Sequence, residues 1–342
     1  MSNKPTRSGV PRYVIGRRPF LEMSAAASIG CLAVKIDAVP GEALMIKNSL
    51  LIDGTNGVAL EGASILIEAG RFTKIVQGHL KAPASARIID ASGKTVVPGL
   101  IDMHAHLISG GFDTISDKSM SFDPSDQKRI LKQMLYWGVT SVCNPVQPLD
   151  SGLELRALVA TKGYPSPRLF ISGPAITAPG GWGGANQPEA RIELSEVGQV
   201  EQQVDRLARA KVDFLKLFYD DMSSSFSNPL PKLDGQLMAA VIRAAHARGL
   251  KVMVHAYRTE DHKDAMRAGA DIMAHSAITQ PVDAEYLDLA RKNRTMYLST
   301  LSVYHDVFDE VAIRELISKN FVQRTVPKKT LATLTGMEPL NS

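Results

Sequence analysis

The chain has 342 residues, of which 44% are hydrophobic and 22% charged, and this length fits one large globular domain together with a small one. Its 39 basic and 35 acidic residues leave a net charge of only +4, which gives no electrostatic case for nucleic-acid binding, since that usually needs a clustered basic face. The two cysteines, Cys31 and Cys143, form no CxxC pair, so we expect neither a thiolate zinc site nor a structural disulfide.

Residues 1–40 are typical of a targeting segment. The paired Arg17 and Arg18 precede Phe20-Leu21, and a run of small and apolar residues follows over 23–34, a pattern that resembles a bacterial twin-arginine export signal. The run is too short to span a bilayer, so we expect no stable membrane insertion. We therefore predict a periplasmic or exported protein; the alternatives are a basic tail or a misassigned start, with a cytoplasmic location.

Residues 41–97 predict a small β-sandwich domain. Strand-like runs over 43–48 and 64–68 alternate with turn-like Asp53-Gly54 and Ala69-Gly70-Arg71. A unit of about fifty residues is too small to count on for independent stability, so it should pack on the domain that follows.

Residues 98–342 change pattern, because short apolar runs now alternate with helical stretches. Such alternation predicts an α/β fold with a parallel sheet of βαβ units, and seven repeats favour a TIM-like barrel that lacks its eighth strand. We expect strands at residues 100–106, 140–144, 168–172, 214–219, 251–256, 272–276 and 296–300. We expect helices at residues 126–137, 195–210, 235–247 and 259–268.

Four histidines and one lysine occur at corresponding places in these strands. His104 and His106 are two positions apart, so within a strand they point to the same side and can bind one metal ion. Lys216 lies inside an apolar strand, where it must lose its charge or extend its amine to solvent. His255 and His275 each end a strand at the rim where barrel active sites are built. Singly each is an ordinary residue; in this order they indicate a metal site.

The motifs resemble those of a known superfamily. Residues 98–106, PGLIDMHAH, look like the opening motif of the amidohydrolase superfamily, and His255-Ala256-Tyr257 followed by Ala274-His275-Ser276 is similar to its imidazolonepropionase-like and Xaa-Pro dipeptidase (prolidase)-like branch. The resemblance covers about residues 43–305. It implies a metal-dependent hydrolase with a (β/α)8 barrel, a flanking β-sandwich and two divalent metal ions, for which we expect zinc.

The resemblance also implies a role for each residue. His104 and His106 would bind the more buried metal, His255 and His275 the second, and Lys216, carboxylated on its amine, would bridge both. His275 and Lys216 would be catalytic. The implied reaction is hydrolysis of an amide or peptide C–N bond by metal-bound hydroxide.

The chain departs from this pattern near its end. The superfamily places a catalytic aspartate at the end of strand eight, and we find no such motif after Thr300. Asp306 and Asp309 lie in a helix-like stretch where a solvated side chain is the plainer interpretation. We therefore expect a C-terminally incomplete barrel over 98–342.

Three further residues are candidates for substrate binding. The glycines around Trp182 indicate a mobile loop over the barrel mouth, although a plain surface loop fits equally. Tyr257 and Arg258 lie just past His255, and an arginine suits a substrate carboxylate through paired hydrogen bonds. A structural ion pair is the alternative for Arg258.

The favoured function is hydrolysis of a small dipeptide-like or N-acyl amino acid substrate by a homo-oligomer. One alternative is a truncated, non-catalytic relative, which the missing aspartate favours. Another is an imidazolonepropionase-like cyclic amide hydrolase, which the export-like N-terminus disfavours.

Overall fold

The computed structural model describes residues 43–55, 57–107, 123–161, 164–183, 188–224, 227–301, 310–326, 328 and 331. The chain divides into two units, Met1–Lys35 and Ile36–Ser342, and every described residue lies in the second. The predicted export segment, Asp306 and Asp309 lie outside the described residues. Within the described part of the chain, no helix has the length and apolar character needed to cross a membrane.

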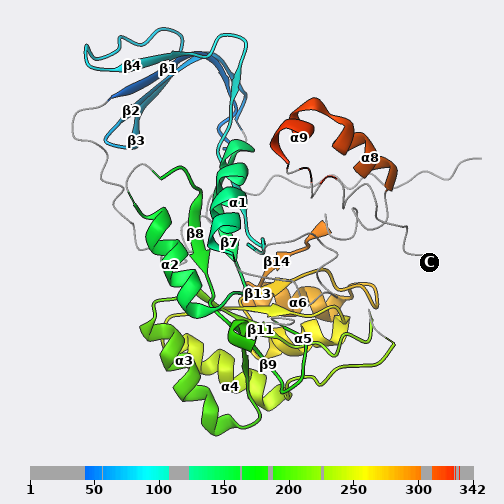
Figure 1. Ribbon diagram of the computed structural model, residues 1–342. Helices are drawn as coiled ribbons and strands as arrows, with labels where there is room; N and C mark the ends of the chain where they lie inside the picture. Colours follow the sequence, from blue (N-terminus) through cyan, green and yellow to red (C-terminus); the bar gives the residue numbers. More distant parts are fainter. Residues whose placement is uncertain are drawn as a thin grey trace, which may run out of the picture. The chain divides into compact units, whose positions relative to one another are not determined.

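The first described segment is a five-stranded sheet. Its strands are β1 (Leu44–Leu51), β2 (Leu60–Glu68), β3 (Arg71–Gln77), β4 (Arg87–Asp90) and β5 (Thr95–Val96). The order is β3-β2-β1-β4, with β5 also on β1 (Figure 1). The predicted turn at Ala69-Gly70 joins β2 to β3, and both residues have positive φ, as a tight hairpin turn requires. The described residues supply this one sheet of the expected sandwich.

The second segment is built of parallel strands. Three form one sheet in sequence order: β6 (Leu100–Asp102), β7 (Val139–Asn144) and β8 (Arg168–Ile171). Six form another, in the order β10-β9-β11-β12-β13-β14: β9 (Ala175–Thr177), β10 (Arg191–Glu193), β11 (Phe214–Phe218), β12 (Lys251–His255), β13 (Ile272–Ala274) and β14 (Met296–Leu298). The predicted α/β class with a parallel sheet is confirmed. No strand follows β14 among the described residues.

Several strands end earlier than the sequence suggested, and each early end has a local cause. β6 stops at Asp102, whose carboxylate accepts a hydrogen bond from the backbone N–H of His104 at 3.0 Å. The prediction that His104 and His106 lie in this strand was therefore wrong: both follow it. β13 stops at Ala274 because His275 has a left-handed backbone, with φ of 74°. The histidines that follow these ends therefore lie outside the strands themselves.

Helices follow most of the strands. They are α1 (Pro124–Tyr136), α2 (Leu149–Val159), α3 (Val200–Arg209), α4 (Gly235–His246), α5 (Thr259–Arg267), α6 (Ala284–Asn293), α8 (Glu310–Ser318) and α9 (Asn320–Thr325). Three begin at an aspartate whose side chain accepts from first-turn N–H groups, namely Asp123, Asp234 and Asp283. The four predicted helices correspond to α1, α3, α4 and α5.

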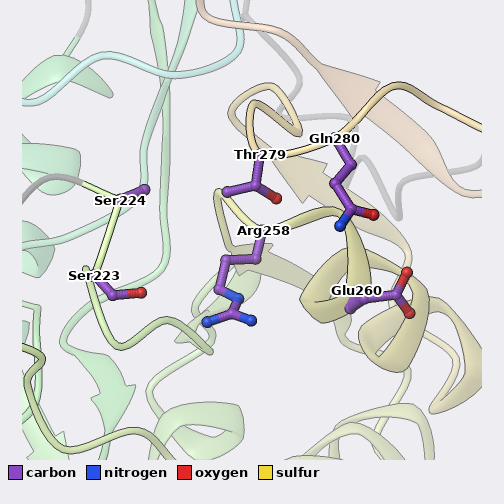
Figure 2. A pocket seen from close by; sticks show the side chains of 6 residues that line it. All are labelled: Ser223, Ser224, Arg258, Glu260, Thr279 and Gln280. Atoms are coloured by element: carbon purple, nitrogen blue, oxygen red, sulfur yellow. The ribbon is translucent and has the colours of Figure 1, made fainter.

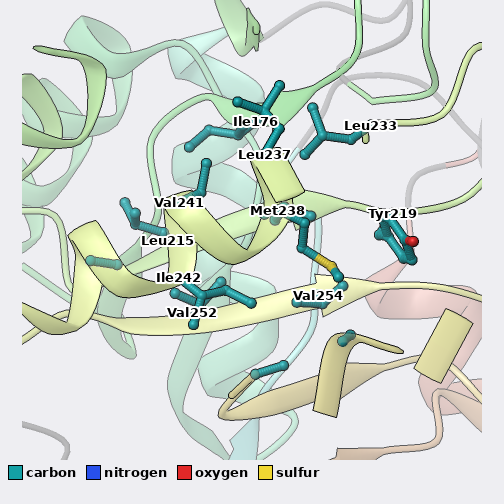
Figure 3. Close-up of a cluster of buried hydrophobic side chains, with 14 of the residues drawn as sticks. Ile176, Leu215, Tyr219, Leu233, Leu237, Met238, Val241, Ile242, Val252 and Val254 are labelled. Atoms are coloured by element: carbon teal, nitrogen blue, oxygen red, sulfur yellow. The ribbon is translucent and has the colours of Figure 1, made fainter. Parts of the chain in front are cut away.

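The largest buried cluster joins helices to strands. Val241 and Ile242 of α4 pack with Leu215 of β11 and Val252 of β12, and all four are fully buried (Figure 3). Burying each such side chain stabilises the fold by about 1.5–3 kcal/mol relative to leaving it in water. This packing fixes β11 and β12, the two strands that carry Lys216 and His255.

A second cluster shows that the parallel strands curve around a common interior. Cys143 of β7, Phe214 of β11, Met253 of β12 and Ile272 of β13 pack together, with side chains next to β6 and from β8 and β14 against them. The backbone N–H of Asp213 also donates to the carbonyl of Ile171 at 2.8 Å, which links the two sheets. If the strands lay in one flat sheet in the order β6-β7-β8-β11-β12-β13, side chains at the ends of β6 and β13 would be roughly 24 Å apart, because neighbouring strands are about 4.8 Å apart. The rings of His104 and His275 are 4.8 Å apart instead.

Candidate metal centre

The predicted histidines and lysine come together at the carboxyl ends of the parallel strands. The ring centroids of His104 and His275 are 4.8 Å apart, and those of His255 and His275 are 4.5 Å apart. The Nε2 atoms of His104 and His106 are 3.2 Å apart. Two nitrogens bound to one tetrahedral zinc ion, each at about 2.0–2.1 Å, would be separated by roughly 3.3 Å. The first histidine pair therefore already has the spacing of two ligands to one ion.

Lys216 is the central side chain of β11 and is 1% exposed. Its Nζ atom has no hydrogen-bond partner among the described residues, and the ring of Phe218 lies 5.2 Å away. Burial lowers the pKa of Lys216 to about 7, because no acceptor compensates the desolvated ammonium. A substantial fraction of Lys216 is therefore a neutral amine near neutral pH.

The two histidines beyond Lys216 are held in different ways. His275 shares a hydrogen bond of 2.9 Å between its Nδ1 and the hydroxyl of Thr300. The Nε2 of His255 is buried without a hydrogen-bond partner among the described residues, and Oδ2 of Asp220 is 3.6 Å from it. Burial is the main cause that lowers the pKa of both histidines, so both are neutral imidazoles with one nitrogen available as a ligand.

These residues fit a metal centre by their chemistry. Within the described part of the chain, no group of three or more His, Cys, Asp or Glu side chains has the arrangement of a complete set of metal ligands. What converges instead is a set of imidazoles around a lysine amine, and three of their buried nitrogens lack a partner: His104 Nδ1, His255 Nε2 and Lys216 Nζ. Buried polar atoms are normally satisfied, so a cluster of unsatisfied nitrogens among several imidazoles fits a site that binds a further polar or charged group.

Tyr257 and Arg258 lie on two different sides of the segment after β12. The ring of Tyr257 contacts the rings of His255 and His275, at 4.8 and 5.1 Å between centroids. Arg258 lines a cavity of about 200 Å³ and has Asp221 at 3.8 Å. Figure 2 shows the Arg258 side chain between Ser223 on one side and Glu260 on the other. The other lining residues are Ser223 and Ser224 in the loop after β11, Glu260 in the first turn of α5, and Thr279 and Gln280 in the loop after β13.

The cavity walls are tied together. The hydroxyl of Thr259 donates to the carbonyl of Gln280 at 2.9 Å, and the backbone N–H of Thr259 donates to the hydroxyl of Thr279 at 3.1 Å. These bonds fix the start of α5 to the loop after β13. The cavity therefore lies at the edge of the sheet where the neighbouring parallel strands β11, β12 and β13 end, which is also where His255 and His275 are placed.

Trp182 packs on the wall of the candidate centre. It lies against a buried cluster of Val146, Ala175, Ala190 and Phe218, and the Phe218 ring is 4.7 Å from that of His255. The backbone carbonyl of Trp182 accepts a hydrogen bond from Thr177 at 2.5 Å. One of its neighbouring glycines has a packing role. A Cβ at Gly183 would lie 2.7 Å from the Phe218 ring, so glycine permits close packing there.

Three residues of this region were not found from the sequence: Asp220, Phe218 and Thr300. Asp220 lies two residues after the end of the buried strand β11, and a polar residue in that position is a signal that could have been used. Phe218 is two positions from Lys216 on the same side of β11, which could also have been used. Nothing in the local sequence distinguishes Thr300.

The sequence of the chain matches known proteins over short segments. The Amidohydrolase family matches at residues 87–134. The dihydroorotase of Geotalea daltonii is 43% identical over 74 residues, which is 22% of this chain and 17% of that protein. The enamidase of Eubacterium barkeri is 34% identical over 113 residues, 31% of this chain and 27% of that protein. The matched segments thus span less than a third of these relatives.

The fold matches solved structures over most of the chain. A prolidase complexed with N-methylphosphonate-L-proline matches with a TM-score of 0.66 and 21% identity, covering 85% of this chain and 72% of that one. A Xaa-Pro dipeptidase with methionine bound in its active site matches with a TM-score of 0.64 and 22% identity, covering 86% and 73%. At this identity the likeness establishes the fold alone.

These matches confirm the resemblance to the amidohydrolase superfamily. The matched family segment includes the His104-Ala105-His106 motif, and the neighbours in fold are prolidases and amidohydrolases. The chain is therefore an α/β protein that is similar to the Amidohydrolase family over residues 87–134 and shares its fold with prolidases and amidohydrolases.

Proposed function

We propose that the protein is an exported, metal-dependent amidohydrolase that cleaves a C–N bond in a small dipeptide-like or N-acyl amino acid substrate and acts as a homo-oligomer. The observation that carries the proposal is the buried amine of Lys216, without a hydrogen-bond acceptor, in a cluster with four histidines. A structural role would give this lysine a carboxylate partner, as Lys263 has in Glu260 and Asp283.

The ligands of two divalent ions, for which zinc suits the imidazole nitrogens, would come from this cluster. His104 and His106 would hold one ion, and His255 and His275 the other. Lys216, carboxylated on its amine, would bridge them. When bound, such ions polarise a substrate carbonyl and lower the pKa of water, which is the chemistry that amide hydrolysis needs.

Lys216 is suited to that modification. Its neutral amine can attack the carbon of CO2, so that an N–C bond forms, one proton leaves the nitrogen and a carbamate anion results. The low pKa of about 7 provides the neutral amine. The product replaces a buried cation by an anion among the histidines, which removes the cost of the desolvated ammonium.

Other side chains would hold the substrate beside the centre. Arg258 would bind a carboxylate in the cavity that it lines, because its planar guanidinium matches two carboxylate oxygens. The ring of Tyr257 contacts the rings of His255 and His275, so its hydroxyl would be able to meet a substrate carbonyl beside them. Trp182 and Phe218 form an apolar wall for a substrate side chain.

The test is to measure metals per chain in the purified full-length protein and then to screen dipeptides and N-acyl amino acids. We expect about two zinc ions per chain and turnover that a chelator abolishes. His255→Ala should lose both turnover and one ion while the far-UV spectrum stays native. His79→Ala is the matched control, because His79 is exposed and belongs to the β1–β5 segment. Metal binding without turnover of any substrate would favour the non-catalytic alternative; no metal in the wild type would overturn the proposal.

We propose export separately, since it depends on residues 1–40 alone. Replacing Arg17 and Arg18 together by lysine should retain a fused reporter in the cytoplasm, whereas the unaltered segment should deliver it to the periplasm. A reporter that stays in the cytoplasm with the unaltered segment would refute export and leave the enzymatic proposal intact.

A further inference from the structure

Asp220 is a buried carboxylate at the end of β11 that the proposed ligand set does not use. The residue is 2% exposed. Its Oδ1 accepts a hydrogen bond from the backbone N–H of Met222 at 2.7 Å, and its Oδ2 accepts one from the backbone N–H of Tyr257 at 2.6 Å. The carboxylate is therefore fixed from two sides, once by its own loop and once by the segment that follows His255.

The same oxygen faces the ring of His255. Oδ2 of Asp220 and Nε2 of His255 are 3.6 Å apart, and that Nε2 is buried with no hydrogen-bond partner within the described residues. The two strand ends are also joined directly, because the backbone N–H of Tyr219 donates to the carbonyl of His255 at 3.0 Å. A shift of a few tenths of an ångström brings the nitrogen and the oxygen into hydrogen-bond range.

A neutral imidazole has one N–H and one bare nitrogen, and its neighbours decide which is which. A carboxylate can only accept, so it stabilises the tautomer with the proton on Nε2. The other nitrogen, Nδ1, is then bare and available to a metal ion. Partners of this kind orient histidine ligands in metal sites and raise their basicity.

We propose that Asp220 is a positioning residue that holds His255 with its proton on Nε2, so that Nδ1 is the atom presented to the metal. The inference rests on the proposed function, since it needs a metal at His255. Both carboxylate oxygens already accept short backbone hydrogen bonds, which favours this role over that of an additional metal ligand.

The control is an aspartate at the opposite end of the same strand. Asp213 precedes β11, accepts a hydrogen bond from the backbone N–H of Ile171 at 2.8 Å and pairs with Arg156 at 3.3 Å. Burial is the main cause that raises the pKa of both Asp213 and Asp220. Asp213→Ala therefore removes a comparable structural carboxylate far from the histidines.

Zinc affinity per folded chain would be measured by chelator competition for the full-length wild type, Asp220→Ala, Asp220→Asn and Asp213→Ala. We expect Asp220→Ala to weaken binding of one ion by about 10- to 100-fold, with two ions still bound at saturation. Asp220→Asn should weaken it less, because an amide oxygen still accepts, and this variant serves if the alanine variant does not fold. Asp213→Ala should lower the melting temperature without changing the affinity.

Nitrogen NMR of the metal-free wild type provides a readout that needs no metal, and His255 should carry its proton on Nε2. A proton on Nδ1, or unchanged zinc affinity in both Asp220 variants, would overturn the inference and leave the proposed function standing. Complete loss of one ion at saturation in Asp220→Ala, as expected for His255→Ala, would make Asp220 a ligand and would also overturn it. A wild type that binds no zinc would overturn the proposed function and this inference together.

Discussion

The Nδ1 atom of His275 lies 2.9 Å from the hydroxyl oxygen of Thr300, and both residues have a left-handed backbone, with φ of 74° and 47°. The left-handed residues after β13 and after β14 thus place the side chains of His275 and Thr300 within hydrogen-bond distance of each other. The backbone N–H of His275 also donates to the carbonyl of Leu298 at 2.8 Å. Both residues therefore keep an unfavourable left-handed backbone at the place where their hydrogen bond orients the ring of His275.

Thr300→Val should weaken zinc binding by about tenfold, because valine keeps the shape of threonine but removes the hydroxyl that fixes the His275 ring. Thr300→Ser should bind zinc as the wild type does. The measurement is chelator competition on folded protein. Thr295→Val is the matched control, since the hydroxyl of Thr295 donates to the backbone carbonyl of Ala270 at 3.0 Å and not to a histidine. Equal affinities for Thr300→Val and the wild type would show that Thr300 does not orient the ligand.

The stability of the metal-free protein should depend on pH through Lys216. Its pKa is lowered from 10.5 to about 7, so the unfolded chain binds more protons than the folded chain between these values. The cost of burying the ammonium is fully present below about pH 7 and fades as the pH rises towards 10.5. Lys216→Met has no such group and should be more stable than the wild type at pH 6.

The difference in unfolding free energy between Lys216→Met and the wild type should narrow above pH 7 by at most about 1.4 kcal/mol per pH unit. It is measured by urea unfolding of both proteins in CO2-free buffer with a chelator present. All other titrating groups are shared, so they cancel in the difference. A gap that stays constant from pH 6 to pH 9 would mean that Lys216 is not a buried, uncompensated amine.

Gly183→Ala should destabilise the fold by more than its backbone conformation alone requires. Gly183 has φ of 126°, and its added Cβ would meet the Phe218 ring at 2.7 Å. Gly138 has φ of 89° but no atom within 4 Å of an added Cβ, so Gly138→Ala measures the backbone cost by itself. The difference between the two losses in unfolding free energy should be about 1–3 kcal/mol.

The contact with Phe218 can be separated by a double-mutant cycle. Removal of the ring in Phe218→Ala should make the additional Gly183→Ala substitution less costly, because the two groups then no longer overlap. Equal losses for Gly183→Ala in both backgrounds would place the clash elsewhere.

The strand series and the candidate centre were predictable because both depend on local patterns. Short apolar runs marked β7, β8, β11, β12, β13 and β14 to within two residues at either end. His255 is the last residue of β12 and His275 follows β13, and in a parallel sheet such positions meet at one edge. Tertiary structure was needed only to bring His104 near His275.

Other features depend on contacts that no local pattern contains. β9 and β10 have three residues each, which is too short for alternation to identify a strand. The strand ends at Asp102 and Ala274 follow from a side-chain hydrogen bond and a left-handed residue, and both are visible only in three dimensions. The pairing of Thr300 with His275 spans 25 positions and involves a residue type that is common in loops.

Arg258→Ala should lower kcat/KM by about 10- to 100-fold for a substrate with a free carboxylate, because it removes charge-assisted hydrogen bonds of about 1.5–3 kcal/mol. The same substrate with its carboxylate converted to an amide should be affected much less, since it never made the ion pair. Arg258→Lys should recover only part of the loss, because an ammonium cannot bind both oxygens in one plane. Arg291→Ala is the matched control, as Arg291 is exposed and pairs with Asp288 on its own helix, α6, at 3.3 Å. The alternative interpretation, a structural ion pair with Asp221, makes the opposite prediction: Arg258→Ala would then lower stability and affect the acid and the amide equally.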